Sequence, residues 1–292
     1  MNAKDRPLVS FDWAIKNMLR NKANYDILEG FLSVLLKQDI KILSILESES
    51  NQEYQTDKFN RVDLVVEDEN KEIMVVEVQN NREVHYFARL LYGASKLIVD
   101  HIQLGESYEK IRKIISISIL YFSLGEGESD YVYHGRTEFY GLNDHSKLDL
   151  KRHDKKALFG MPERLNASVF PEYYLIELER FRNVVKSDLD EWIYFFKNAE
   201  IKQEFRSKNI QRAREKLDLL QMPESERKAY EKYLLNKASE QGMFESAKLE
   251  GKIEGKIEGK IEDAKVMLAK GMPVALISEI TGLAEAEIFK LK

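Results

Sequence analysis

The stretch RVDLVVEDENKEIMVVEVQ, residues 61–79, decides the fold that this sequence predicts. Residues 61–66 and 73–79 are rich in β-branched side chains, which favour strands. Between them lies a polar cluster, residues 67–72, which includes the turn-favouring Asn70. Two such runs joined by a short polar segment indicate a β-hairpin.

The second strand of this hairpin carries two polar side chains on one face. Glu77 and Gln79 are two residues apart, so they project to the same side of a strand, and the valines at 76 and 78 project to the other. A five-residue loop at 68–72 would place Asp63 directly opposite Glu77, with Cβ atoms about 5 Å apart. A four-residue loop would instead place Asp63 beside Val76, and the sequence permits both registers.

Two carboxylates directly opposite each other are destabilising unless a cation neutralises them. The chain has no cysteine, so a metal would be held by oxygen or imidazole, which favours Mg²⁺, with Mn²⁺ or Ca²⁺ as alternatives. Asp63, Glu77 and the backbone carbonyl of Val78 are the candidate ligands. Glu29 or Asp26, on an opening helix, is a further candidate. An ordinary half-exposed hairpin with a polar outer face is the alternative.

The segments around the hairpin predict a mixed α/β domain. Apolar residues at helical spacing predict helices over 11–20, 24–37 and 81–101. Apolar and β-branched runs predict strands over 113–122, 131–140 and 173–178. After Ser187, at an expected helix cap, the sequence is helical almost to its end.

Residues 251–262 repeat GKIE three times. At 3.6 residues per turn, a four-residue repeat drifts about 40° per step, so its isoleucine stripe winds around a helix. The repeat is typical of a solvated helix or linker, with a short oligomerising helix as the alternative. The last segment, residues 264–292, reads as short helices broken at Gly271-Met272-Pro273 and at Thr281-Gly282.

Charge and hydropathy limit the classes of function. The formal net charge is −5, so contact with nucleic acid would depend on local patches. No stretch approaches the roughly 18 apolar residues of a membrane span, and the first residues lack the apolar core of a signal peptide. We therefore expect a soluble cytoplasmic protein.

The hairpin motifs VDLVVED and IMVVEVQ resemble those of the bacterial PD-(D/E)XK nuclease-family transposases, also called recombination-promoting nucleases. Glutamine stands where the general motif has lysine. The resemblance extends over nearly the whole chain, through four further segments: FDWAIKNMLRNKANYDILEGFLSVLL, ARLLYGASKLIVDHIQLGESYEKIRKIISISIL, YYLIELERF and MLAKGMPVALISEITGL.

This resemblance implies an α/β, restriction-endonuclease-like mixed central sheet flanked by helices, with a helical C-terminal extension. The pattern of elements along the chain divides it into a nuclease-like domain (1–185), a helical extension (186–250) and the GKIE repeat with a small helical tail (251–292). Asp63 and Glu77 match the family's metal-binding positions and Gln79 its third active-site position, whereas Glu29 matches loosely.

The expected function is that of a Mg²⁺-dependent DNA endonuclease, linked to recombination or mobile elements. Its partner would be DNA, and a homodimer through the helical C-terminal region would be the simplest way to cut both strands. Since the amide of Gln79 cannot act as a base, the alternative is a catalytically weak or inactive DNA-binding or assembly protein of the same fold. An authentic transposase is a third reading, but the chain shows no separate spaced triad for that chemistry.

Two further segments could contact DNA. Arg82, His85 and Arg89 recur about one helical turn apart, with Tyr92 beyond them, and could meet phosphates or simply form a solvated helix face. The segment ALISEITGLAEAEIFKL resembles the second and third helices of a helix-turn-helix. Its last helix carries acidic residues that would repel phosphates, which favours packing or oligomer contact.

Overall fold

The structure is a computed structural model of the chain, and it describes residues 8–46, 64–102, 106, 111–125, 130–148 and 169–291. Asp63, the first candidate metal ligand, lies outside the described residues. The chain divides into two compact units, Met1–Pro223 and Glu224–Lys292. Each unit is described by itself.

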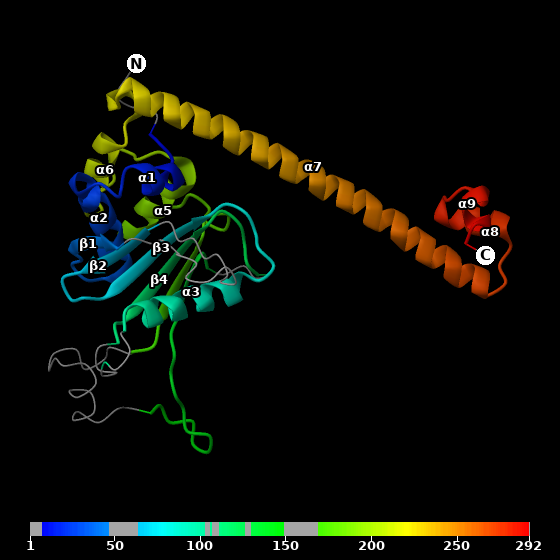
Figure 1. Cartoon of the computed structure of the whole chain (residues 1–292), viewed down its shortest axis with the longest axis horizontal. Coiled ribbons are helices and arrows are strands. Elements are labelled where there is room, and N and C mark those ends of the chain that lie inside the picture. The colour runs from blue at the N-terminus through cyan, green and yellow to red at the C-terminus, as the bar shows by residue number, and fades with distance from the viewer. Residues whose placement is uncertain are drawn as a thin grey trace. The chain divides into compact units, whose positions relative to one another are not determined.

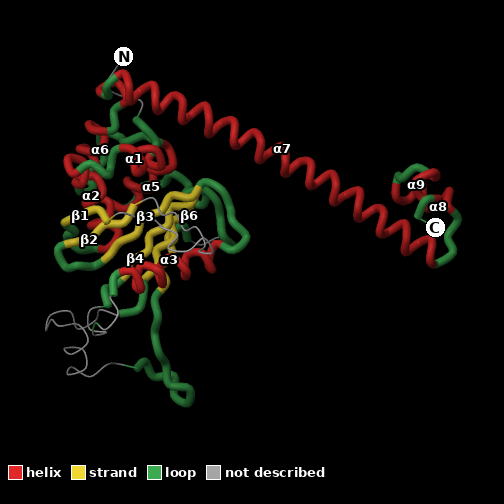
Figure 2. The backbone as a smooth tube through the Cα atoms, viewed as in Figure 1, coloured by secondary structure: helices red, strands yellow, loops and turns green. Residues whose placement is uncertain are grey.

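A six-stranded mixed sheet forms the centre of the first unit (Figure 2). Its order is β1-β2-β3-β4-β6-β5, in which β3, β4 and β6 are parallel neighbours and the other pairs are antiparallel. The strands are β1 (Ile42–Leu46), β2 (Leu64–Asp68), β3 (Ile73–Gln79), β4 (Ile114–Leu120), β5 (Val132–Gly135) and β6 (Glu172–Glu177). The predicted α/β class with a mixed central sheet is confirmed.

The β2–β3 hairpin has the register that a loop at 68–72 predicts. Its pairs are Leu64 with Val76, Val65 with Val75, Val66 with Met74, and Glu67 with Ile73. The turn is organised by the Asp68 carboxylate, whose Oδ1 accepts hydrogen bonds from the backbone N–H groups of Asn70 (2.9 Å) and Glu72 (2.8 Å). Asp68 is buried, so these bonds fix the loop length, and with it the pairing of the two strands.

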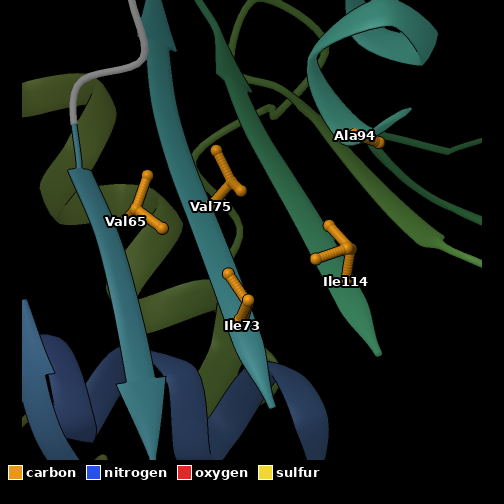
Figure 3. Packing of buried hydrophobic residues seen from close by; sticks show 5 residues of the cluster. All are labelled: Val65, Ile73, Val75, Ala94 and Ile114. Carbon is orange, nitrogen blue, oxygen red and sulfur yellow. The ribbon is translucent and has the colours of Figure 1, made fainter. Parts of the chain in front are cut away.

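Helix α3 (Tyr86–Asp100) connects β3 to its parallel neighbour β4 and covers one face of the sheet (Figure 1). Ala94 of α3 packs in one buried cluster with Val75 of β3 and Ile114 of β4 (Figure 3). Val65 of β2 belongs to the same cluster. Because side chains alternate along a strand, the odd-numbered residues of β2 and β3 face α3.

The opposite face of the sheet is covered by α1 (Phe11–Asn17), α2 (Tyr25–Leu36), α5 (Asp188–Asn198) and α6 (Ile210–Lys216) (Figure 1). An aromatic cluster joins three of these helices: Phe11 and Phe31 both contact Phe196, with ring centroids 4.2 and 4.8 Å apart, and Phe31 also lies 6.1 Å from Trp192. Helix α6 is tied to α2 by the ion pair of Lys216 with Asp26, and both α5 and α6 belong to the first unit. The short 3₁₀ helices η1 (Lys22–Asn24) and η3 (Leu219–Gln221) complete its described helices.

Two strands differ from expectation. Strand β1 was not predicted. Within the described residues it pairs with β2 alone, its register is irregular between Ile42 and Ser44, and Leu43 is exposed to solvent. Strand β5 covers only Val132–Gly135 of the predicted 131–140, and an isolated bridge pairs Tyr140 with Lys147 beyond it. Both are edge strands, where short length and solvent exposure weaken the alternating pattern.

The second unit consists of helices. The GKIE repeat lies within α7 (Glu224–Ala269), a continuous helix of 46 residues, followed by α8 (Val274–Thr281) and α9 (Glu285–Phe289). The end of α7 packs against α8 and α9 through a buried cluster of Ala264, Ile277, Leu283 and Ile288. The predicted breaks are present, since Gly271 and Gly282 adopt left-handed backbone conformations. In the described part of the chain, no helix is both long and apolar enough to cross a membrane.

A close helix approach in the first unit predicts the effect of one substitution. A Cβ at Gly30 of α2 would lie 2.5 Å from the carbonyl oxygen of Lys208 and 2.9 Å from Trp192 Cζ2. Gly30→Ala should therefore lower the free energy of unfolding by about 1–3 kcal/mol. Urea unfolding followed by tryptophan fluorescence measures this, because both tryptophans, Trp13 and Trp192, lie in the first unit.

Gly242→Ala is the matched control. A Cβ at Gly242 of α7 would meet no atom within 4 Å. This variant should leave the fluorescence midpoint unchanged and raise the stability of α7 by up to about 1 kcal/mol, seen as helical circular dichroism retained to higher urea. A Gly30→Ala protein as stable as wild type would contradict the described packing of α2.

Candidate active site

The candidate site lies where β3 ends, on the face of the sheet that α3 covers. Glu77 and Gln79 both point to this face, in phase with Ile73 and Val75 of the α3-facing cluster. On the parallel neighbour β4, Ser118 is the register partner of Glu77. The two polar side chains of β3 therefore lie beside a serine, at the carboxyl end of the parallel strands, where ligands of open α/β sheets commonly bind.

Four side chains form one polar network at this position. Arg89 Nη2 of α3 donates to Glu77 Oε1 at 2.6 Å, and Arg89 Nε lies 3.1 Å from Glu83 Oε2. The other oxygen of Glu83 accepts a hydrogen bond from Gln79 Nε2 at 2.8 Å. Glu77 is largely buried, whereas Glu83 is exposed. Because an isolated buried carboxylate is costly, the contact with Arg89 stabilises the ionised form of Glu77.

Two buried hydroxyl groups lie on the same side of the sheet as Glu77. The hydroxyls of Tyr86 and Ser118 are both inaccessible to solvent. Burial raises the pKa of Tyr86 well above its ordinary value, and the nearby Ser118 partly opposes this rise. Tyr86 also supports the network, since its ring lies 5.5 Å from the Arg89 guanidinium carbon.

The structure brings some of the predicted residues together. Glu77 and Gln79 share a face and are joined through Arg89 and Glu83. Val78 lies between them on β3, with its side chain buried on the opposite face. Asp63 precedes Leu64, the first residue of β2, and lies outside the described residues.

The acidic residues of α2 are held elsewhere. Glu29 accepts hydrogen bonds from the backbone N–H of Ile42 (3.0 Å) and from Lys41 Nζ (3.2 Å). Ile42 pairs with Asp68 at the turn end of the β2–β3 hairpin, close to Ile73. Glu77 lies four residues beyond Ile73 on β3, so roughly 13 Å of strand separates it from this end. The structure does not bring Glu29 to Glu77. Asp26 is held by Lys216 of α6 at 2.7 Å.

Sequence reasoning did not identify the partners of Glu77. Of the basic residues at helical spacing, only Arg89 has a described contact with the network, whereas Arg82 Nη2 reaches the carbonyl oxygen of Leu124 at 3.4 Å and His85 is the N-cap of α3. Glu83 and Ser118 were not singled out. The serines that interrupt the apolar run KIISISIL were a usable signal, because a buried strand that tolerates hydroxyls has polar neighbours.

The donor set of the site suits a hard divalent cation. Glu77, Gln79 and Ser118 offer only oxygen atoms or an amide, which are ligands of Mg²⁺, Mn²⁺ and Ca²⁺. The ionised side chains of Glu77, Glu83 and Arg89 together carry one net negative charge. Among the described residues, no group of three or more acidic or histidine side chains is arranged to bind a metal.

The mixed sheet with helices on both faces, and with a glutamate and a glutamine at the end of β3, defines a PD-(D/E)XK nuclease-like α/β protein. Comparison with protein families agrees: residues 9–247 match the PD-(D/E)XK nuclease family transposases, and the chain belongs to this family. Membership indicates a nuclease-like function and confirms the resemblance seen in the sequence. No match was found among curated proteins or solved structures.

The contacts of Glu29 predict a role in stability. Glu29→Ala removes the acceptor of the buried Ile42 N–H, so the free energy of unfolding should fall by about 1–3 kcal/mol. Glu29→Gln, which retains an acceptor oxygen, should lose less. Urea unfolding measures both changes, and Mn²⁺ titration of the folded variants should match wild type. A Glu29→Gln protein of normal stability but weakened Mn²⁺ binding would instead identify Glu29 as a ligand.

Proposed function

We propose that this protein is a metal-dependent DNA endonuclease that hydrolyses phosphodiester bonds in recombination or mobile-element biology. The observation that carries the proposal is the register of β2 and β3. Leu64 pairs with Val76, and both strands run on by sequence into an acidic residue, Asp63 before Leu64 and Glu77 after Val76. This is the register for which the sequence predicts Asp63 opposite Glu77, and Asp63 itself lies outside the described residues.

Asp63 and Glu77, with the backbone carbonyl of Val78, would hold one divalent cation, for which Mg²⁺ is the first choice. When bound, such a cation polarises the phosphate and makes water a stronger nucleophile at neutral pH. The carboxylates would fix the position of the cation and, through it, that of the phosphate, and the buried surroundings of Glu77 would strengthen its attraction to the cation. The net negative charge of the described network supports the binding of a further cation.

Gln79 would orient the attacking water rather than take its proton. Its amide oxygen can accept a hydrogen bond, and its Nε2 is anchored by Glu83 at 2.8 Å. The exposed Glu83 carboxylate is the described group nearest to Gln79 that could accept a proton, since an amide cannot. During hydrolysis, the water oxygen would bond to phosphorus as its proton passes to Glu83, one ester P–O bond would break, and the released alkoxide would take a proton from solvent water.

The alternative is a DNA-binding or assembly protein that has the fold but little or no catalysis. The absence of lysine at position 79 favours this alternative, as does the engagement of Glu77 by Arg89. A cleavage assay separates the two proposals. An endonuclease should cleave DNA in a reaction that needs the Glu77 carboxylate, whereas a binding protein should bind DNA without cleaving it.

Purified protein with Mg²⁺ should nick or cut supercoiled plasmid DNA. Asp63→Asn and Glu77→Gln should each reduce the rate by about 10³-fold or more, because losing one metal ligand removes several kcal/mol of charge stabilisation. Gel analysis of plasmid forms over time measures the rate. Removal of divalent cations by a chelator should abolish cleavage by wild type.

Glu67→Gln is the matched control for Glu77→Gln. Glu67 lies on the same face of the same hairpin and makes the same kind of ion pair, with Arg112 Nη1 at 2.8 Å. This variant should cut DNA at close to the wild-type rate. Cleavage that survives both Asp63→Asn and Glu77→Gln would sink the proposed active site.

We further propose that the protein forms a homodimer through α7. Ile253 and Ile257 of the GKIE repeat are about half exposed and lie one helical turn apart on α7. An exposed apolar stripe on a long helix can pack against the same stripe of a second copy. Two copies would provide two sites, one for each strand of a duplex.

The double variant Ile253→Lys/Ile257→Lys should turn a dimer into a monomer, because two charges on the stripe would have to be desolvated in the interface. Light scattering coupled to size exclusion measures the mass of wild type and variant. Lys252→Glu/Lys256→Glu changes charge in the same helical turns but outside the stripe, and should leave the mass unchanged. A wild-type protein that is monomeric at all concentrations would contradict the proposal.

A further inference from the structure

The Glu77 carboxylate, the described candidate metal ligand, is already bound to a cation of its own chain. Arg89 Nη2 lies 2.6 Å from Glu77 Oε1, a short charge-assisted hydrogen bond. The side chain of Glu77 is 11% exposed and that of Arg89 is 24% exposed. Burying an ionised carboxylate without a positive partner costs free energy. The Arg89 guanidinium offsets this cost for Glu77, as a bound metal ion also would.

The Arg89 side chain has a second attachment that does not involve Glu77. Its Nε lies 3.1 Å from Glu83 Oε2, and its guanidinium carbon lies 5.5 Å from the centre of the Tyr86 ring. Glu83 is exposed and precedes α3 in the chain. The contact with Glu77 can therefore break while the guanidinium stays at the site, held by Glu83 and Tyr86.

A divalent cation on Glu77 would compete with this guanidinium. Both would contact the same carboxylate, and two positive charges a few ångströms apart repel each other. Binding of the metal would weaken the bond between Glu77 and Arg89, whereas the contact with Glu83 would be less affected. The guanidinium would then have N–H groups available to a phosphate, which it can bind in a bidentate manner.

We propose that Arg89 is the exchangeable cation of this site. In the metal-free protein it neutralises Glu77; when a divalent cation binds Glu77, Arg89 turns from Glu77 to a phosphate group of the bound DNA. This inference rests on the proposed function. Position 79 is a glutamine and carries no positive charge, so Arg89 would provide the positive charge that stabilises the phosphate. Since arginine does not lose its proton in proteins, Arg89 stabilises negative charge and does not activate water.

The first test measures metal binding without DNA or turnover. Mn²⁺ is titrated into wild type, Arg89→Gln and Arg112→Gln, and bound metal is followed by calorimetry or by electron paramagnetic resonance. Removal of the competing guanidinium should tighten Mn²⁺ binding in Arg89→Gln by about 3- to 10-fold, as expected for a partly buried ion pair. Arg112→Gln breaks the comparable pair with Glu67, 2.8 Å long, and should bind Mn²⁺ as wild type does.

The second test measures cleavage under single-turnover conditions with saturating Mg²⁺. Arg89→Gln should cut DNA at least about 100-fold more slowly than wild type, because one charge contact to phosphate is lost. Arg89→Lys, which keeps the charge but not the planar fork, should recover part of this loss. Tighter metal binding together with slower cleavage is the signature of exchange, since a purely structural ion pair would not produce opposite effects.

Unchanged or weaker Mn²⁺ binding by folded Arg89→Gln would overturn the inference, whatever its effect on cleavage. Thermal unfolding with and without Mn²⁺ establishes that the variant is folded, and Arg89→Lys provides a second, milder variant. Tighter Mn²⁺ binding in Arg89→Gln, with cleavage as fast as wild type, would overturn the contact with phosphate. If wild type cuts no DNA at all, the proposed function fails, while the metal titration still decides whether Arg89 competes at Glu77.

Discussion

The structure of the first unit depends on the hydrogen-bond ladder of β3, which is antiparallel to β2 on one side and parallel to β4 on the other. Side chains alternate along a strand, so a slip of one residue would exchange the two faces. Glu77 would then enter the face where Val76 and Val78 are buried, and a valine would replace it under α3. A slip of one residue is therefore unfavourable mainly because it would bury the Glu77 carboxylate among apolar side chains, away from Arg89.

The same arrangement explains why the site is polar but not open. Six residues separate the end of β3 from the start of α3, and the chain must pass over the sheet to reach β4. The first turns of α3 therefore lie over the carboxyl end of the parallel strands, where Tyr86 fills space and Arg89 meets Glu77. Further along α3, Ala94 allows close packing on Val75 and Ile114. One helix thus supplies apolar packing at one end and charge at the other.

Local features were predictable from the sequence and long-range contacts were not. The hairpin register follows from the loop length and the polar turn, and the strand KIISISIL is recognisable from its continuous apolar character. The bond between Glu77 and Arg89 depends on how α3 lies against the sheet, which helical periodicity does not specify. Glu29 looked like a possible ligand in the sequence, but its carboxylate accepts hydrogen bonds from Ile42 and Lys41. These residues lie at the start of β1, a strand too short and too exposed to be recognised from the sequence. Which acid is available to a ligand is decided by such tertiary hydrogen bonds.

The GKIE repeat of α7 has a consequence for how this chain can change length. Because the repeat is uninterrupted helix, the gain or loss of one four-residue unit adds or removes about 6 Å of helix and turns everything beyond it by about 40°. No side chain in the repeat needs a new neighbour for this, since each unit repeats the same glycine, lysine, isoleucine and glutamate. Duplication or deletion of twelve nucleotides would therefore change the length of α7 in discrete steps, with the first unit and the packing of the end of α7 against α8 and α9 left intact.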